Sequence, residues 1–255
     1  MSAAASTASA PTQRRVLPRG WGDLFRQVAI WLGFLAAYQA TRGLADRNPA
    51  AAFENGLKVI DIEQRGNALF ELSLQAAVQS SEVLRFATWG TYWLSQFTIL
   101  GATLLWVYLR RNEHFIRFRN MIMLANVIGL AGYVLAPTAP PRMFPDFGFV
   151  DTMSSIATLN HGSGAIEFAS NPYAAMPSLH AADALIVGIV LFAVCRNWFA
   201  KAVWALWPFW VWFSVMATGN HFWLDVLAGV FVALVALAVI YGRPLRRLRL
   251  RPGAA

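Results

Sequence analysis

Two histidines in this sequence each stand at the start of a long apolar segment. His180 belongs to the stretch PYAAMPSLHAADAL, and His221 belongs to TGNHFWLDVLAG, where Asp225 follows four residues later. Residues four apart share one face of a helix, so the Asp225 carboxylate can hold one nitrogen of the His221 ring while the other nitrogen points into a cavity. This spacing is typical of a nucleophile that is oriented by an acid.

Two further polar residues could take part in the same chemistry. Arg142, in the stretch APPRMFP, carries a planar guanidinium that suits a phosphate group. Asp183 follows His180 by three residues, and a carboxylate inside an apolar segment is costly and usually faces a polar cavity. Asp183 could tune the protonation of His180 or bind a substrate hydroxyl. An acid in the first turn of a helix is also favoured by the helix dipole alone, so both interpretations stay open.

Each of these residues has an ordinary structural explanation when it is taken singly. A histidine at a helix start is often a cap or an interfacial residue, and His-x-x-x-Asp is a common stabilising pair. A catalytic site explains these residues better when they are taken together, because the two histidines, the aspartate and the arginine are all expected at the same face of a membrane.

The segments that carry these residues are apolar blocks of membrane-spanning length. Of the 255 residues, 57% are hydrophobic and 13% are charged, and apolar blocks of this length indicate transmembrane helices. We therefore expect an all-α integral membrane protein with six transmembrane helices, at residues 24–44, 86–109, 121–136, 179–194, 202–217 and 222–241. Residues 1–23 are expected to form a disordered basic tail, residues 24–241 one catalytic domain, and residues 242–255 a basic cytoplasmic tail.

The positive charges predict how these helices are oriented. The net charge is +8, and the basic residues cluster before the first expected helix, between the second and third, between the fourth and fifth, and after the sixth. The positive-inside rule assigns that side to the cytoplasm, so both termini would be cytoplasmic and both histidines external, in a multi-pass protein of the plasma membrane. The tail RPLRRLRLRP fits a topology anchor that attracts anionic lipid, and no nucleic-acid partner is expected.

Three connections are then external, at residues 45–85, 137–177 and 218–221. The first has the mixed apolar and charged spacing of amphipathic helices that lie along the outer interface. The second is a loop of about 40 residues, and loops of that length are often functional.

The stretches AMPSLHAA and TGNHFWLDVLAG resemble the second and third signature motifs of the type 2 phosphatidic acid phosphatase superfamily, which also includes vanadium haloperoxidases. The Leu in PSLH, where hydrolases of the superfamily usually have Gly, and the APPR of the first motif resemble its inositolphosphotransferase-like branch. The resemblance covers residues 121–241. It implies a membrane phosphatase or phosphotransferase that acts on lipid phosphates through a phosphohistidine, without a metal or other cofactor.

Carried over by position, the resemblance implies a role for each candidate residue. His221 resembles the nucleophile that becomes phosphohistidine, and Asp225 the residue that orients it. His180 matches the general acid that protonates the leaving alcohol, and Arg142 matches the arginine of the first motif. Ser178 and the amides of the helix that follows would bind phosphate oxygens, in agreement with the anion affinity of helix N-termini.

Two positions depart from the superfamily pattern. Leu135 stands where the first motif usually has Lys, and Val215 stands where the third usually has Arg. Stabilising the charge on phosphoryl oxygens is a large part of such catalysis, so other groups must replace these cations. The candidates are Asn220, the helix amides, Lys58 and Arg65. Two missing cations should weaken capture of a doubly charged phosphate monoester most, which favours a phosphodiester or diphosphate lipid as donor.

Two alternative functions remain open. One is a plain phosphatase for phosphatidic acid or a polyprenyl diphosphate. The other is a transporter or membrane scaffold, which would need polar residues across the membrane depth, and the expected spans have few apart from Asp183 and Asn126. The sequence does not determine the lipid, the acceptor or the oligomeric state.

Overall fold

The computed structural model describes residues 17–45, 48–152 and 172–249, and only the backbone of residues 40–45 and 243–249. These residues form helices joined by turns and loops, without a β-strand, so the expected all-helical fold is confirmed. The helices are α1 (Gly20–Ala45), α2 (Pro49–Arg65), α3 (Glu71–Gln79), α4 (Glu82–Leu94), α5 (Leu100–Arg110), α6 (Asn112–Leu135), α8 (Leu179–Val194), α9 (Trp198–Ala217) and α10 (Trp223–Arg249). Two short 3₁₀ turns, η2 (Pro141–Met143) and η3 (Pro145–Phe147), follow α6.

In the described part of the chain, four helical stretches are long and apolar enough to cross a membrane. They are Glu82–Arg110, Asn112–Leu135, Trp198–Ala217 and Trp223–Gly242. The six expected spans are therefore not confirmed as a set. α8 has only 16 residues, fewer than the roughly 20 that a lipid-facing span usually needs. α1 has 26 residues, but polar and charged residues such as Asp23 and Arg26 interrupt its apolar face.

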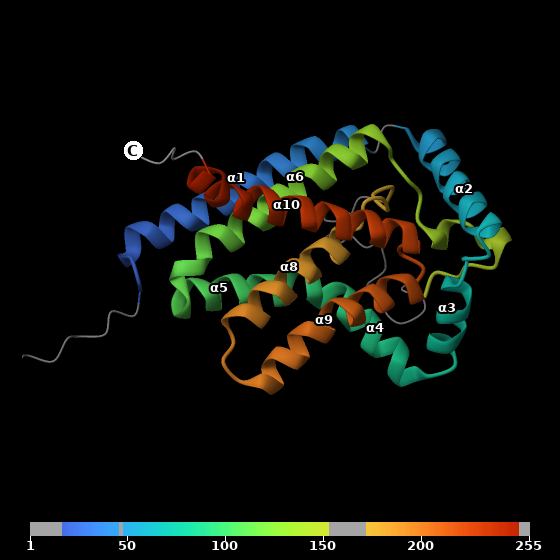
Figure 1. Cartoon of the computed structure of the whole chain (residues 1–255). Helices are drawn as coiled ribbons and strands as arrows, with labels where there is room; N and C mark the ends of the chain where they lie inside the picture. The colour runs from blue at the N-terminus through green and yellow to red at the C-terminus, as the bar shows by residue number, and fades with distance from the viewer. Residues whose placement is uncertain (1–16, 46–47, 153–171, 250–255) are drawn as a thin grey trace, which may run out of the picture.

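The short helix α8 is the centre of the bundle. It packs against α9, α10 and α6, and eleven of its 16 residues are buried. Figure 1 shows α8 between α9 and α10, with the longer helices around it. Because protein surrounds α8 on most sides, its length does not have to match the thickness of the lipid.

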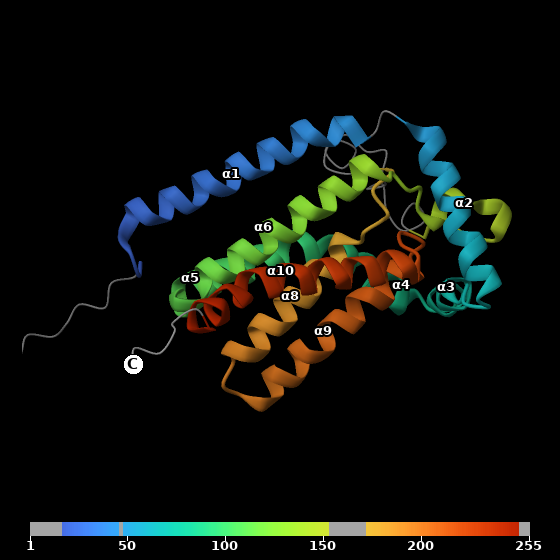
Figure 2. The same ribbon diagram turned by 45° about the horizontal axis from the view of Figure 1, so that its top comes forward.

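The outer helices differ in how closely they join this bundle. α1 packs chiefly along α6, and Figure 2 shows it as the outermost helix on that side. α9 exposes large apolar side chains such as Trp198, Leu206 and Phe209. Such a surface suits lipid contact rather than water.

The segment between α1 and α4 forms the two helices that its spacing predicts. α2 begins after Asn48, whose side chain accepts a hydrogen bond from Ala51 N, and Pro49 occupies the first turn, where a proline costs little. α2 and α3 lie across one end of the bundle (Figure 1). Buried residues of α2, including Ala52 and Ile60, form a small core with Phe144, Phe149 and Phe222. That these helices rest on a membrane interface stays a prediction.

The connection between α4 and α5 is not a plain α-helix. Residues Ser95–Ile99 adopt a π-helical turn, η1. Single π turns inside α-helices are frequent at functional sites, because they redirect the side chains on one face. Gln96 and Phe97 of this turn line the cavity described below.

Candidate active site

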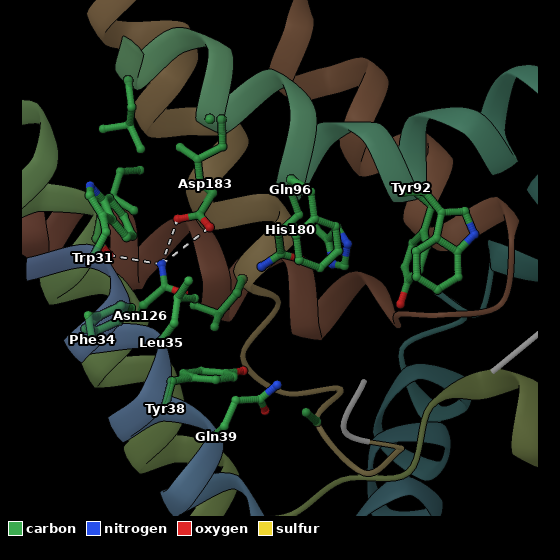
Figure 3. Close-up of a pocket in the computed structure, with 18 of the residues that line it drawn as sticks. Trp31, Phe34, Leu35, Tyr38, Gln39, Tyr92, Gln96, Asn126, His180 and Asp183 are labelled. Carbon is green, nitrogen blue, oxygen red and sulfur yellow. Dashed lines mark hydrogen bonds between the residues drawn. The ribbon is translucent and has the colours of Figure 1, made fainter. Parts of the chain in front are cut away.

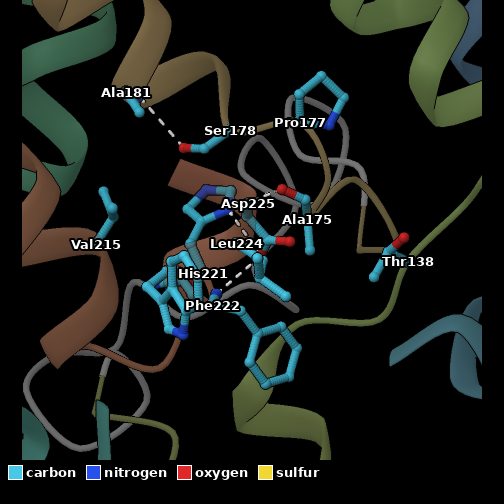
Figure 4. A network of polar contacts seen from close by, with 12 residues as sticks. Thr138, Ala175, Pro177, Ser178, Ala181, Val215, His221, Phe222, Leu224 and Asp225 are labelled. Carbon is cyan, nitrogen blue, oxygen red and sulfur yellow. Dashed lines mark hydrogen bonds and ion pairs between the residues drawn. The ribbon is translucent and has the colours of Figure 1, made fainter. Parts of the chain in front are cut away.

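His221 lies in the turn between α9 and α10. Gly219 has a left-handed backbone with φ 74°, and a Cβ there would lie 2.9 Å from Val150 O, so this turn requires glycine. The His221 ring is buried, and its Nδ1 lies 2.9 Å from Ala175 O and 3.5 Å from Asp225 Oδ2. Both partners are acceptors, so Nδ1 carries the hydrogen and Nε2 keeps its lone pair. Figure 4 shows both groups on the same side of the ring.

Asp225 contacts the His221 ring and also accepts two backbone hydrogen bonds. Its Oδ2 accepts a hydrogen bond of 2.8 Å from Phe222 N, and its backbone oxygen accepts one of 2.9 Å from Ser178 N. The second bond joins the start of α10 to the start of α8. Gly229 permits this approach, since a Cβ there would lie 2.2 Å from Ser178 O. Sequence spacing anticipated the proximity of the carboxylate to the ring, but not that Ala175 O makes the shorter contact.

His180 stands in the first turn of α8 and faces His221. Their ring centroids are 5.7 Å apart at an interplanar angle of 61°. Tyr92 of α4 stacks on the His180 ring, with centroids 4.4 Å apart and planes 24° from parallel. Ser178 is fully buried and caps α8, since its Oγ accepts a hydrogen bond from Ala181 N. The cap explains where α8 begins, and contact between Ser178 and a phosphate stays a prediction.

Arg142 comes close to the same turn from the other side. Its backbone N donates to Gly219 O at 2.8 Å, and its Nη1 donates to Asn220 Oδ1 at 2.7 Å. Asn220 in turn donates to Thr218 Oγ1 at 2.8 Å. Burial lowers the pKa of the Arg142 guanidinium, although arginine stays charged at neutral pH. One half-buried cation is therefore tied to the residue that precedes His221.

The positions where the superfamily carries two more cations are occupied quite differently. Leu135 is 83% exposed at the end of α6, whereas Val215 is fully buried. Lys58 and Arg65 do not replace the missing charge. They lie on the outer face of α2, paired with Glu54 and Asp61, and neither lines the cavity near the histidines.

Two glutamates near His221 were not anticipated from the sequence. Glu71 Oε1 accepts a hydrogen bond of 2.6 Å from Trp223 N, and Glu63 Oε1 accepts one of 3.3 Å from Leu224 N. Both side chains are fully buried. Acceptors at the first turn of a helix are favoured by its unpaired amides and its dipole. With Asp225, these glutamates place three carboxylates on the first turn of α10, and we call them the rear carboxylates.

The rear glutamates lie on α2 and α3, outside the candidate spans, and burial changes their ionisation. Burial, with the neighbouring Glu71 charge, raises the pKa of Glu63 to about 9. Burial also raises the pKa of Glu71. No donor among the described residues reaches their second oxygens, which adds to the cost of a charged form. Nothing in the sequence pointed to buried glutamates here. The amphipathic spacing of this segment predicts that its charged residues lie on a solvent-exposed face.

A cavity of about 640 Å³ opens in front of the two histidines. It lies between α1 on one side and α4, η1, α5, α6 and α8 on the other, and Figure 3 shows the α1 side chains facing Tyr92, Gln96 and His180. Its walls are mostly apolar and aromatic, as in pockets that bind small organic molecules. Its polar lining residues are His180, His221, Asp183, Asn126, Gln39 and Gln96, beside aromatic residues such as Tyr38 and Tyr133.

Asp183 and Asn126 form a hydrogen-bonded pair inside this cavity. Asn126 Nδ2 lies 3.1 Å from Asp183 Oδ1 and 3.4 Å from Oδ2, and it also donates to Ile122 O at 3.0 Å. Asp183 is only 3% exposed. Asp183 thus faces a cavity, as predicted, but the walls of this cavity are mostly apolar rather than polar.

Comparison with known proteins places the chain in a family. The sequence model of the PAP2 superfamily matches residues 57–239, well over half of the chain, so the chain belongs to this superfamily. A phosphoinositol dihydroceramide synthase of Bacteroides thetaiotaomicron is 31% identical over 140 residues, which cover 49% of this chain and 45% of the synthase. The chain thus matches less than half of that relative's length. The predicted resemblance is confirmed, and this relative agrees with the inositolphosphotransferase-like branch. No solved structure matches.

The sequence predicts no metal centre. Across residues 17–45, 48–152 and 172–249, no three His, Cys, Asp or Glu side chains are grouped so that they could hold a metal ion.

Proposed function

We propose that the chain is a membrane phosphotransferase or phosphatase that acts on lipid phosphates through a phosphohistidine at His221. The observation that carries this proposal is the setting of the His221 ring. Its Nδ1 is engaged by Ala175 O and Asp225, and the ring faces His180 at the wall of a mostly apolar cavity. A ring fixed in this tautomer presents Nε2 as a nucleophile.

In the first half of the reaction, His221 Nε2 attacks the phosphorus and the bond from phosphorus to the leaving oxygen breaks. Protonated His180 donates its proton to that oxygen. In the second half, His180 takes the proton of an acceptor hydroxyl, whose oxygen attacks the phosphorus and releases His221. Asp225 and Ala175 O stabilise the positive ring, and Arg142, Asn220 and Ser178 hold the phosphoryl oxygens.

The donor we infer is a phosphodiester or diphosphate lipid. The superfamily motifs usually supply three cations, and in the described part of this chain only Arg142 is present at those positions, beside the residue that precedes His221. Leu135 and Val215 carry no charge. A singly charged diester needs less compensation than a monoester. The Bacteroides relative is a phosphoinositol dihydroceramide synthase, so phosphatidylinositol is the donor to test first. The alternative, a plain phosphatase, uses the same first half and passes the group to water.

We also propose that both termini are cytoplasmic and the histidines external. The end of the bundle away from α2 and α3 holds the ends of α5 and α8 and the starts of α6 and α9 (Figure 1). Four basic residues lie at these helix ends, Arg110, Arg111, Arg196 and Lys201. That distribution supports a cytoplasmic basic end. Asp146→Cys and Trp198→Cys, each in a Cys195→Ala background, test it with an impermeant thiol reagent on intact cells. Labelling is expected at 146 only, and labelling at 198 only would reverse the orientation.

The activity is tested with purified protein in lipid nanodiscs. Phosphatidylinositol, phosphatidic acid and a polyprenyl diphosphate are supplied separately, with and without added alcohols, and free phosphate and transfer products are followed. We expect turnover of the diester, transfer to alcohols, and loss of both in His221→Ala. His114→Ala is the matched control, because His114 is 42% exposed on α6 beside Glu113. Normal turnover in His221→Ala would exclude the phosphohistidine. Release of phosphate from phosphatidic acid alone, without transfer, would favour the plain phosphatase.

A further inference from the structure

Building on the proposed function, we infer that Glu71 and Gln75 of α3 are positioning residues for His221. They hold the two chain segments that border the His221 turn, and they affect the rate of the chemical step without touching the substrate. Both residues lie outside the motifs around His180 and His221, and neither of them lines the cavity in front of the histidines.

The first observation is the contact between α3 and the start of α10. Glu71 Oε1 accepts a hydrogen bond of 2.6 Å from Trp223 N, two residues after His221. Amides in the first turn of a helix have no partner within that helix, so Glu71 supplies the acceptor that this amide needs. Phe70, directly before Glu71, stacks on the Trp223 ring, with centroids 6.4 Å apart and planes 22° from parallel. The start of α3 therefore holds both the backbone and the side chain of Trp223.

The second observation is the contact between α3 and the chain on the other side of the turn. Gln75 follows Glu71 by four residues, so both side chains share one face of α3. Gln75 is 3% exposed. Its Oε1 accepts a hydrogen bond of 3.0 Å from Val150 N, and its Nε2 donates one of 2.6 Å to Val150 O. Nε2 also lies 3.3 Å from Thr152 Oγ1. Both polar groups of this buried side chain thus bind the backbone of one residue and fix its position.

The third observation is that Gln75 and Val150 pack against the beginning of the turn. A Cβ on Gly219 would lie 2.9 Å from Val150 O and 3.1 Å from Gln75 Nε2. The Gly219 backbone therefore rests directly on the segment that Gln75 fixes. Because Glu71 and its neighbour hold Trp223 at the other end, α3 supports the turn that carries His221 on both sides.

This support matters because the rate of transfer depends on where Nε2 of the nucleophile lies. The ring is held by Ala175 O and Asp225, and Asp225 belongs to the same first turn of α10 as Trp223. A shift of that turn would move the ring relative to His180 on α8. A displacement of about 1 Å between reacting groups can lower a rate about a hundredfold.

The experiment measures kcat and KM per mole of folded protein in mixed micelles, where the mole fraction of phosphatidylinositol can be varied. Glu71→Met and Gln75→Met keep the approximate length of each side chain but remove its hydrogen bonds. Each should lower kcat by about ten- to a hundredfold, with KM within about twofold of wild type. Glu71→Gln keeps an acceptor for Trp223 N and should restore most of kcat. Gln79→Met, the same change at an exposed position of α3, is the matched control and should behave as wild type.

A second measurement does not depend on turnover. Hydrogen exchange is followed in the peptide that contains the Trp223 amide, in folded protein. Exchange should be faster in Glu71→Met than in wild type and slow again in Glu71→Gln. A residue that served only the overall stability would lower the unfolding temperature and leave kcat of the folded protein unchanged.

The outcomes separate this inference from the proposed function. Absence of turnover in wild-type protein would overturn the proposed function, and this inference with it. If wild type is active, an unchanged kcat in folded Glu71→Met or Gln75→Met overturns the inference alone. A loss in Glu71→Gln as large as that in Glu71→Met, or unchanged exchange at the Trp223 amide in Glu71→Met, also overturns it. If the methionine variants do not fold, Glu71→Asp and Gln75→Asn, which shorten each side chain by one methylene group, are judged by the same kcat criterion.

Discussion

The two sides of His221 contrast sharply in how they hold carboxylates. Behind the ring, the rear carboxylates Asp225, Glu71 and Glu63 accept the amides of Phe222, Trp223 and Leu224, and all three are closed off from solvent. In front of it, Asp183 has one amide nitrogen as partner and faces a cavity of about 640 Å³. The rear carboxylates bind backbone amides at the start of α10, whereas Asp183 on the front side faces a cavity that a ligand can enter. Burial of a carboxylate therefore does not by itself identify its role, which depends on what its oxygens accept.

The largest effect that tests this contrast is expected for Asp225→Asn. The change keeps the shape of the side chain but removes the charge that supports a positive His221 ring. By analogy with other acid–histidine pairs, we expect kcat to fall by about 10²–10⁴. The measurement is turnover of the lipid donor, with circular dichroism to verify that the fold is retained. A fall below about twofold would show that Ala175 O alone orients the ring.

A smaller effect is expected from the ionisation of Glu63. Its pKa is raised to about 9 from an ordinary value of 4.5, so the protonated form is favoured in the folded protein. Its contribution to stability is complete below about pH 4.5 and is lost as the pH rises toward about 9. Glu63→Gln mimics the protonated form, and it should flatten the decline in thermal stability of detergent-solubilised protein between pH 5 and pH 9.

The control for that measurement is Glu54→Gln, because Glu54 is an exposed glutamate on the same helix, paired with Lys58. It should leave the wild-type decline unchanged. If Glu63→Gln and wild type lose stability in parallel over this pH range, then Glu63 titrates normally and the rear carboxylates are charged.

The smallest effects are expected on the outer face of α2. Lys58→Ala and Arg65→Ala remove cations whose side chains are 62% and 79% exposed. Exposed ion pairs of this kind contribute little, so activity and thermal stability should stay within about twofold and a few degrees of wild type. Turnover of phosphatidylinositol and of phosphatidic acid is the measurement. A selective loss of monoester turnover would mean that these cations reach the phosphate after all.

The sequence alone was sufficient for the all-helical fold and for the superfamily, and it supplied the residues that we propose carry the chemistry. Apolar blocks and turn residues placed the long helices, and the motifs around His180 and His221 indicated the superfamily. Both signals are local, since they depend on residues close together in the chain. The number of spans was not predictable in the same way. α8 is as apolar as a span, but its length and burial show that protein surrounds much of it.

What only the tertiary structure decided depends on contacts between distant segments. Glu63 and Glu71 precede Trp223 by more than 150 residues, and Tyr92 stacks on a histidine 88 positions later. The Asn126–Asp183 pair likewise joins α6 to α8. No periodicity within one helix encodes such contacts, because they arise when α2, α3, α4 and α6 close around α8 and the start of α10. The sequence determined which polar groups the chain offers, and the packing determined which carboxylates bind the backbone beside His221 and which one faces the cavity.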